Sequence, residues 1–396
     1  MSARNSKTHY GSLAKLFHWL TALLVLTAFG LGVYGNYGIN PETETGITQL
    51  AAVFSLHKTV GITAFIVAVL RILWALNNVK PGLLNTDHKM ESVTAEVVHW
   101  LLYISLVFVP LSGWIHHAAA SGFAPILWPL GQTLPLVPKS EAVSEFFASW
   151  HFIFTKVLLF SILLHFLGAL KHHIIDKDST LRRMLPGVPT IPTGVDTCHP
   201  KGPIVGAFLI YLLAMGAGSY ISLQHRSEGV AVAELAEVSS GWEVQSGSLG
   251  ITVKQFGSDV EGIFSDWTAE ISYDEATQAG DLAVTVSVGS LTLGSVTDNA
   301  LGTDYLDAAM FGTATYTGQI SADANGHIVK GSLNLRGVDA PLNIPFSLTT
   351  QNGVATAKGS AVIDRRSHKI GELQATENNL GFSVIVNFDL VAQKAN

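Results

Sequence analysis

Histidine is the residue type in this sequence with the most capacity for chemistry. The chain has 15 histidines, and 13 of them lie in residues 1–225. Four of these, His18, His57, His151 and His165, lie inside long apolar stretches. A polar side chain in such a stretch is costly and usually has a function. An imidazole there could bind a metal, carry a proton or bridge two helices.

The spacing of these histidines groups them into two pairs. His151 and His165 are fourteen residues apart, which on one helix puts them on the same face, about 21 Å apart along the axis. His18 matches the depth of His165, and His57 matches that of His151. The pattern predicts two stacked haems, each held by two imidazoles, which suits electron transfer. The alternatives are polar bridges between helices, or zinc, for which no third ligand lies on a nearby turn.

Composition excludes several classes of protein. Only 13% of the residues are charged and 48% are hydrophobic, whereas about a quarter of a soluble protein is charged. A purely soluble protein, a disordered chain and a basic nucleic-acid binder are therefore excluded. The single cysteine, Cys198, excludes a disulfide scaffold, an iron–sulfur cluster and a thiolate zinc site. No C-x-x-C-H motif is present, so a covalently attached haem is not expected.

The histidines must be positioned by membrane-spanning helices. A span needs about 20 mostly apolar residues, and five stretches qualify: 13–35, 51–75, 97–117, 146–170 and 203–224. We interpret the first as an uncleaved anchor, because it is too long for a signal peptide and no small-residue cleavage site follows it.

Lysine and arginine predict the orientation of these spans, since both concentrate on the cytoplasmic side. The side opposite the N-terminal tail carries only Lys139 in its connections. The tail side carries ten: Arg4, Lys7, Lys15, Lys80, Lys89, Lys171, Lys177, Arg182, Arg183 and Lys201. The N-terminus is therefore expected in the cytoplasm, with everything after the fifth span outside.

The region after the spans has a different character. Residues 201–396 carry ten basic and twenty acidic residues, a net charge of −10. Apolar residues alternate with polar ones in segments such as 282–288, 342–348 and 382–390, which indicates half-buried antiparallel strands. A closed barrel or a sandwich is expected, and a barrel of roughly eight strands can enclose one small ligand. Candidate lining residues, each equally compatible with ordinary core, are Phe256, Phe264, Trp267, Met310 and Phe311.

Several motifs in the first half resemble the bacterial four-helix cytochrome b561 family over residues 9–187. They are His18-Trp19, His57-Lys58, the PLSGW run at 110–114 and the HHIIDKDSTLRRM run at 172–184. The resemblance implies two b-type haems (heme b) in the bacterial inner membrane, together with a quinone site. It also implies that the haem ligands are His18, His57, His151 and His165. One type of member is a superoxide oxidase, and others conduct electrons to quinone.

Other residues of this half have weaker assignments. Arg71 shares a face with His57 and could hold a haem propionate or simply anchor the span. His172 and His173 could transfer protons at a quinone site or form a hydrated interfacial pair. His99 is expected to be a structural interface residue. Another pair, His116 and His117, could tune the surroundings of the outer haem or be hydrated, and Cys198 receives no role.

The second half resembles the YceI-like family over residues 240–393. The segments that carry the resemblance are 248–275, the L-R-G-V-x-x-P run at 335–341 and 361–372. The resemblance implies a lipocalin-like barrel that binds long isoprenoid lipids, including quinones, in a hydrophobic lumen. This half shows no Ser/His/Asp arrangement and no metal cluster in its sequence, so nothing in it indicates catalysis.

Together these features predict an α-helical transmembrane bundle, with four haem-binding helices and a fifth tethering helix, followed by an all-β antiparallel lipocalin-like barrel. The expected domains are 1–187, a linker 188–202, the fifth span 203–224 and the barrel 230–396. The expected location is the bacterial inner membrane, with the N-terminus cytoplasmic and the barrel periplasmic.

The expected function is a quinone-linked membrane haem oxidoreductase, with superoxide as one possible donor, although an acidic barrel would not steer an anion. One alternative is an isoprenoid-binding or delivery protein with a redox-sensing anchor. Another is an electron-conduit subunit for a separate dehydrogenase. The expected partners are the lipid bilayer and ubiquinone or another isoprenoid lipid, with a homodimer left open and nucleic acid excluded.

Overall fold

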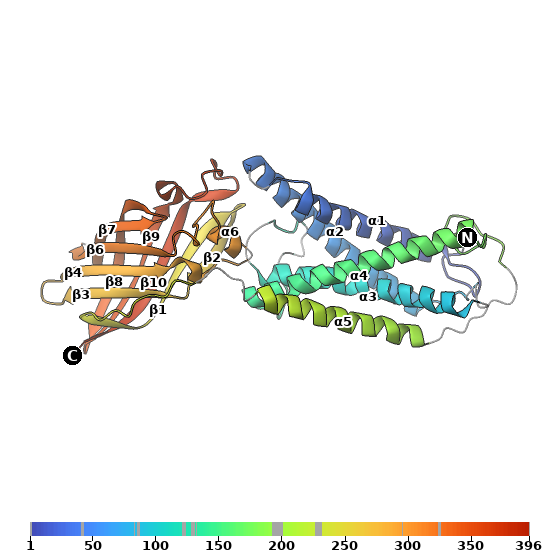
Figure 1. The fold of residues 1–396 in the computed structure, drawn as a ribbon, viewed down its shortest axis with the longest axis horizontal. Coiled ribbons are helices and arrows are strands. Elements are labelled where there is room, and N and C mark those ends of the chain that lie inside the picture. Colours follow the sequence, from blue (N-terminus) through green and yellow to red (C-terminus); the bar gives the residue numbers. More distant parts are fainter. Residues whose placement is uncertain are drawn as a thin grey trace.

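A computed structural model shows a helical bundle followed by a β-barrel (Figure 1). It describes residues 2–40, 43–82, 84, 88–120, 124–127, 131, 133–191, 201–225, 232–294, 296–323 and 326–395. The bundle helices are α1 (Ser12–Tyr37), α2 (Glu44–Leu76), α3 (Lys89–Ala119), α4 (Glu141–Ile174) and α5 (Gly202–His225).

Within the described residues, five helices are long and apolar enough to cross a membrane, which confirms the five predicted spans. Most are longer than the apolar stretches, because polar residues continue or cap the helices beyond the bilayer core. Thr43 Oγ1 accepts a hydrogen bond from Gly46 N at 3.0 Å, and Ser140 Oγ accepts one from Val143 N at 3.4 Å. Such side-chain caps satisfy amide groups that a helix start leaves unpaired.

The helices pack mainly as the neighbouring pairs α1 with α2 and α3 with α4, and α5 lies against α3 and α4. At Gly218 of α5 a Cβ atom would lie only 2.7 Å from Trp150 Cδ1, so the small residue permits close approach there. The indole Nε1 of Trp150 also donates to Ser219 Oγ at 3.1 Å. The fifth helix is thus packed onto the bundle as well as leading to the barrel.

The second part is a closed antiparallel barrel. Its strands are β1 (Trp242–Gln255), β2 (Ser258–Phe264), β3 (Trp267–Asp274), β4 (Ala279–Ser287), β5 (Leu291–Thr292), β6 (Thr313–Asp323), β7 (Gly326–Leu335), β8 (Val338–Gln351), β9 (Val354–Asp364) and β10 (Leu380–Lys394). Strand β10 pairs with β1 from Trp242↔Lys394 to Gln255↔Leu380, which closes the ring. This closure confirms the barrel and excludes the sandwich.

Three hairpins of the barrel turn on two residues that both have positive φ. These are Phe256-Gly257 (47° and 77°), Arg336-Gly337 (54° and 71°) and Asn352-Gly353 (52° and 74°). Two positive φ angles are the mark of a type I′ turn, whose twist matches that of the flanking strands. Asn-Gly is the residue pair most typical of this turn, because both residue types tolerate positive φ.

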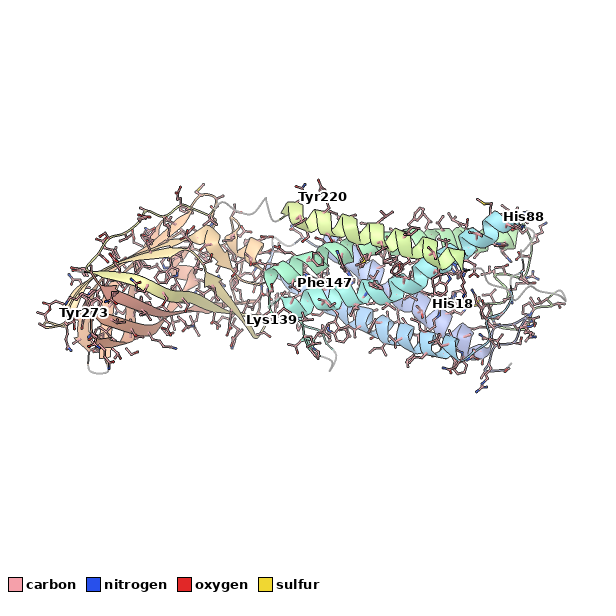
Figure 2. The ribbon with its side chains drawn as sticks, turned by 90° about the horizontal axis from the view of Figure 1, so that it is seen from below. His18, His88, Lys139, Phe147, Tyr220 and Tyr273 are labelled. Atoms are coloured by element: carbon pink, nitrogen blue, oxygen red, sulfur yellow. The ribbon has the colours of Figure 1, made fainter. Side chains whose placement is uncertain are left out.

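The N-terminal tail and the barrel lie at opposite ends of the bundle (Figure 1). Figure 2 shows His18 toward the same end as His88, whereas Lys139, Phe147 and Tyr220 lie toward the barrel. The barrel contacts the start of α2. Asn379 Nδ2 donates to Glu44 O at 3.2 Å, Thr48 Oγ1 lies 3.1 Å from Asn379 Oδ1, and Thr376 Oγ1 donates to the Glu44 carboxylate.

Candidate functional site

One pair of histidine rings, here called the outer pair, lies in the half of the bundle nearer the barrel. The rings of His57 on α2 and His151 on α4 have centroids 6.3 Å apart and planes at 89°. His57 Nδ1 donates to Ala28 O at 2.7 Å, and His151 Nδ1 donates to Val109 O at 2.8 Å. A carbonyl can only accept, so each Nδ1 carries the proton and each Nε2 keeps its lone pair.

Two glycines make room for these outer rings. A Cβ atom at Gly32 would lie 3.2 Å from His57 Cε1, and one at Gly113 would lie 2.9 Å from His151 Nδ1. The second distance is shorter than an ordinary contact. Gly113, from the PLSGW run, is therefore needed for the observed position of the His151 ring.

The second pair, here called the inner pair, lies toward the end of the bundle that carries the N-terminal tail. The rings of His18 on α1 and His165 on α4 have centroids 6.1 Å apart, with planes at 58°. His99 on α3 is a third ring here, 5.0 Å from His165, and its Nδ1 donates to Ala95 O of its own helix at 2.6 Å. His99 thus lies beside a predicted pair rather than at a plain helix interface. Its depth in the third apolar stretch was the signal that sequence reasoning left unused.

Arg71 lies near this inner pair. Its Cζ is 5.5 Å from the centroid of the Tyr103 ring, and the guanidinium lies within electrostatic range of His18 and His165. Among the described contacts its cation–π interaction with Tyr103 holds the side chain toward α3.

Both pairs have the ring spacing that a metal held between two imidazoles requires. Metal–imidazole bonds are about 2 Å long, so two rings that bind one metal from opposite sides have centroids about 6 Å apart. The observed separations are 6.1 and 6.3 Å. The residues present therefore fit an iron with two axial nitrogens at each level.

The histidines at the outer end of α3 make protein contacts. His116 Nδ1 lies 2.9 Å from Ser144 O on α4. His117 is only 4% exposed and lies 3.1 Å from Lys58 Nζ, which also donates to Ala124 O at 2.8 Å. These contacts join α2, α3 and α4, and the hydrated alternative for His117 is wrong because the side chain is buried.

At the N-terminal end, His172 and His173 differ. His172 Nδ1 lies 2.7 Å from Asp178 Oδ2 and 3.1 Å from Asp176 Oδ2, whereas His173 is exposed. Burial alone would raise the pKa of Asp178, but hydrogen bonds from Thr180 and His172 outweigh it and hold that pKa below its usual value. His172 is thus part of a hydrogen-bonded network with two carboxylates, and His173 faces solvent.

The end of the 172–184 motif run and the residues that follow it, up to 187, fold back over the same end of the bundle. Arg183 donates to Gly82 O at 2.9 Å and to Thr8 O at 2.6 Å. Two bundle residues reach up to meet the run. Lys15 Nζ donates to Leu185 O at 2.7 Å, and Trp19 Nε1 donates to Met184 O at 2.9 Å. The run therefore tethers the N-terminal tail to the bundle, while Cys198 lies outside the described residues.

The barrel encloses an apolar cavity of about 650 Å³, a size typical of small-ligand sites. Phe256, Phe264 and Trp267 line it, as predicted. The prediction was wrong for Met310, which is 74% exposed, and for Phe311, which packs beside Gly337. Both lie in a turn segment before β6, where the alternation of strands does not apply.

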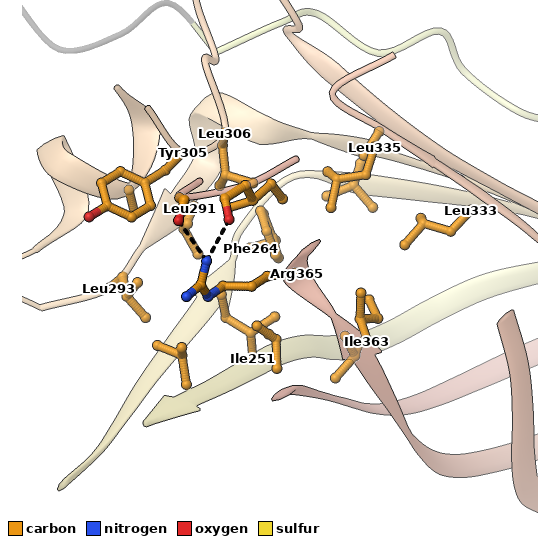
Figure 3. A pocket seen from close by; sticks show the side chains of 18 of the residues that line it. Ile251, Phe264, Leu291, Leu293, Tyr305, Leu306, Leu333, Leu335, Ile363 and Arg365 are labelled. Carbon is orange, nitrogen blue, oxygen red and sulfur yellow. Dashed lines mark hydrogen bonds between the residues drawn. The ribbon is translucent and has the colours of Figure 1, made fainter. Parts of the chain in front are cut away.

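Polar groups gather at one end of this cavity. Arg365 and Gln374 are each 2% exposed and Asn379 is 3% exposed. All three line the cavity, and so do Ile47 and Leu50 from α2. Figure 3 shows the Arg365 guanidinium among apolar side chains such as Ile251, Phe264 and Leu291. Sequence reasoning did not select Arg365 or Gln374, because burial of a polar residue in a loop leaves no periodic signal.

Comparison with known proteins agrees with this geometry. The family profile described as prokaryotic cytochrome b561 matches residues 9–187, and the profile of the YceI-like domain matches residues 242–392. Cytochrome b561 homolog 2 of Escherichia coli K12 is 31% identical over 193 residues, which cover 47% of this chain and 95% of that protein. The chain belongs to the prokaryotic cytochrome b561 family.

Further relatives match one half each. The probable superoxide oxidase CybB of Yersinia pestis is 28% identical to this b561 protein over 181 residues, which cover 45% of the chain and 96% of the relative. The structure of BcnA from Burkholderia cenocepacia is similar to 37% of the chain, with 28% identity, a TM-score of 0.35 and 96% of BcnA covered.

The b561 protein is therefore a multi-pass membrane protein with an electron-transfer domain, and its family implies b-type haem. Its C-terminal part is a YceI-like barrel. Each histidine pair offers imidazole nitrogens to a bound group, and in the pair His57/His151 the Nδ1 atoms are already engaged by backbone carbonyls.

Proposed function

We propose that this b561 protein is a quinone-linked electron-transfer oxidoreductase that binds two b-type haems. His18 and His165 would hold the inner haem, and His57 and His151 the outer one. The observation that carries the proposal is the ring spacing of 6.1 and 6.3 Å in two pairs of partly buried histidines. When bound, haem would supply one-electron redox chemistry, and the two imidazoles of each pair would hold its iron.

The protein's own part in this chemistry is to orient the ligands. The Nδ1–H groups of His57 and His151 each donate to a backbone carbonyl. Such a bond selects the tautomer, fixes the ring and makes the ligating nitrogen more basic. Arg71 is a candidate partner for a propionate of the inner haem, because it lies near His18 and His165 and carries a permanent charge.

The quinone part of the proposal is supported by the apolar cavity of the barrel. Its volume of about 650 Å³ and its aliphatic and aromatic lining suit an isoprenoid lipid. The excess of basic residues in the connections on the N-terminal side supports a cytoplasmic N-terminus and a periplasmic barrel. His172 would exchange protons at the cytoplasmic face through its contacts with Asp176 and Asp178.

A second function is favoured by the same cavity. The chain would be an isoprenoid-binding or delivery protein, and the haem domain would sense redox state without turning over quinone. The electron donor separates the remaining possibilities. Similarity to the probable superoxide oxidase CybB of Yersinia pestis favours a superoxide donor, whereas a partner dehydrogenase would make this chain a conduit. The net charge of −10 after residue 200 disfavours steering of superoxide.

The test begins with a reduced-minus-oxidised spectrum and the haem content per chain. We expect two b-type haems in the wild-type protein and one in each of His18→Ala and His151→Ala. His173→Ala is the matched control, because His173 lies on α4 but is exposed. A wild-type content below two, or a content that these substitutions leave unchanged, contradicts the ligand assignment.

The second measurement is stopped-flow reduction of the haems by ubiquinol, and reoxidation by ubiquinone, in the wild-type protein. Reaction with both, lost in His151→Ala, supports the oxidoreductase. Haem-loaded protein that reacts with neither quinone species, while still binding lipid, supports the delivery function instead. Reduction that appears only after a partner protein is added supports the conduit.

A further inference from the structure

The cavity of the barrel is completed by the membrane bundle. Ile47 and Leu50, in the first two turns of α2, line it together with residues of all ten barrel strands and their loops. The junction is held by hydrogen bonds from Asn379 and Thr376 to Glu44 of α2. The open end of the lumen therefore faces the bundle and not the surrounding water alone.

At this end one buried polar atom has no partner. Gln374 is 2% exposed and lines the cavity, and its Nε2 makes no hydrogen bond among the described residues. The orientation of the amide follows from its neighbours. Glu44 O can only accept, so the Asn379 atom that faces it is the NH₂ group. That group also donates to Gln374 Oε1 at 3.2 Å, which leaves Nε2 as the free donor.

Hydrogen bonds hold the backbone of the loop that carries Gln374, and because the residue is 2% exposed its side-chain amide does not reach water. Arg365 Nη2 donates to Gln374 O at 2.6 Å, and Gln374 N donates to Gly371 O at 2.9 Å. The guanidinium also binds the carbonyls of Ile370, Gly371, Leu380 and Gly381. A buried donor fixed in this way costs free energy until an acceptor reaches it.

The hydrogen bonds of Arg365 indicate which kind of acceptor the free N–H of Gln374 would bind. Arginine has five N–H donors, and all five of Arg365 are used by backbone carbonyls. No donor of this cation remains for an anionic head group such as a phosphate. The free donor is a neutral amide beside a cation whose own donors are all used, which suits an uncharged carbonyl oxygen.

We propose that Gln374 Nε2 binds a carbonyl oxygen of an isoprenoid quinone head group at the α2-facing mouth of the barrel, with the lipid tail in the lumen. The proposal rests on the proposed lipid-binding function. It also connects the two halves, because Leu50 at the mouth and His57 of the outer pair are seven residues apart on α2, about 10 Å along its axis. The head group is thus held nearer to the outer histidine pair than to the inner one.

The first test measures equilibrium binding of two lipids to the full chain in detergent. Decylubiquinone has carbonyl oxygens, and squalene is an isoprenoid hydrocarbon without any. In Gln374→Leu we expect the Kd for decylubiquinone to rise about tenfold and the Kd for squalene to stay unchanged. Gln374→Met, which keeps the unbranched shape, must give the same pattern. Gln351→Leu is the control, because Gln351 is an exposed glutamine at the end of β8.

The outcomes separate this site from the function on which it rests. If the wild-type chain binds neither lipid, the lipid-binding function fails and the site with it. If it binds both and the Gln374 variants weaken both equally or neither, the head-group site fails and the function stands. Tighter binding of an isoprenyl phosphate than of decylubiquinone also overturns the carbonyl assignment.

The second test concerns the mouth. Ile47→Trp should narrow it and slow the uptake of ubiquinone from phosphatidylcholine vesicles by about fivefold or more, with little change in Kd. Leu56→Trp is the matched control, since Leu56 is an exposed apolar residue of α2 that does not line the cavity. Equal uptake rates in the two variants would show that lipid enters elsewhere.

Discussion

The bundle and the barrel distribute apolar residues in opposite ways. Leucine and phenylalanine side chains on the bundle surface are exposed, for example Leu23 by 65%, Phe160 by 60% and Leu213 by 75%, and the histidine pairs face inward. In the barrel the apolar side chains line a cavity. Lipid is the solvent of the bundle and water that of the barrel, so the same rule of burial gives reversed arrangements.

The buried polar groups of the two regions differ in a complementary way. In both, backbone carbonyls satisfy the donors, at His57 and His151 in the bundle and at Arg365 in the barrel. What remains free in the bundle is the lone pair of Nε2, which suits a metal. What remains free in the barrel is the N–H of Gln374, which suits a carbonyl. The character of the unsatisfied atom therefore indicates the class of ligand.

The largest expected effect is at the histidine pairs. His57→Ala should reduce the haem content from two to one and leave the inner haem spectrum intact, whereas the double variant His57→Ala/His165→Ala should hold none. The reason is that each pair has its own two ligands, about 21 Å from the other along α4. The measurement is haem per chain with the reduced spectrum of each variant. Loss of both haems in the single variant would show that the pairs are not independent.

A second effect tests the barrel alone. Arg365→Met should lower the free energy of unfolding of the barrel by about 4 kcal/mol, because it leaves several buried carbonyls without donors. Arg366→Met is the matched control, since that side chain is exposed, pairs with Asp364 and lies over the Phe382 ring, so a much smaller change is expected. Denaturation followed by circular dichroism of the strands, with the haem absorbance as an internal reference, measures both. Equal losses of unfolding free energy in the two variants would show that Arg365 does not stabilise the loop at the mouth of the cavity.

A smaller effect tests the glycine beside the outer ring. Gly113→Ala should weaken haem retention at the outer site about tenfold, because the new Cβ would displace the His151 ring. Gly168→Ala, also in a bundle helix, meets no atom within 4 Å and should leave both haems unchanged. Haem transfer to apomyoglobin measures retention. An unchanged outer site in Gly113→Ala would mean that the ring has room to move.

The smallest effect is a pH dependence of the barrel. Burial raises the pKa of Tyr316 to about 12, from about 10 in the unfolded chain. The resulting stability is fully present below pH 10 and is lost as the pH rises toward 12, by about 1 kcal/mol at pH 11. Denaturant unfolding at pH 9 and pH 11 measures it. Tyr316→Phe should show a smaller loss, and an identical loss would assign it to other groups.

Much of this protein could be predicted from the sequence where one element suffices. The fourteen-residue spacing of His151 and His165 determines a shared face within a single helix, and the alternation at 282–288 determines a strand with one buried side. Met310 and Phe311 were predicted wrongly because they lie in a turn, where no period relates sequence to side-chain direction. Arg365 and Gln374 were missed because their burial depends on strands that close the barrel far away in the sequence.

The sequence by itself therefore determined the two folds, the five spans and the depth of each histidine, since these follow from periodicity and apolar length. Only the tertiary structure decided that His99 joins the inner pair, that glycines cradle the outer rings and that Ile47 and Leu50 complete the barrel cavity. The physical reason is that contacts between elements depend on how the elements pack, and the local patterns of one sequence do not specify that packing.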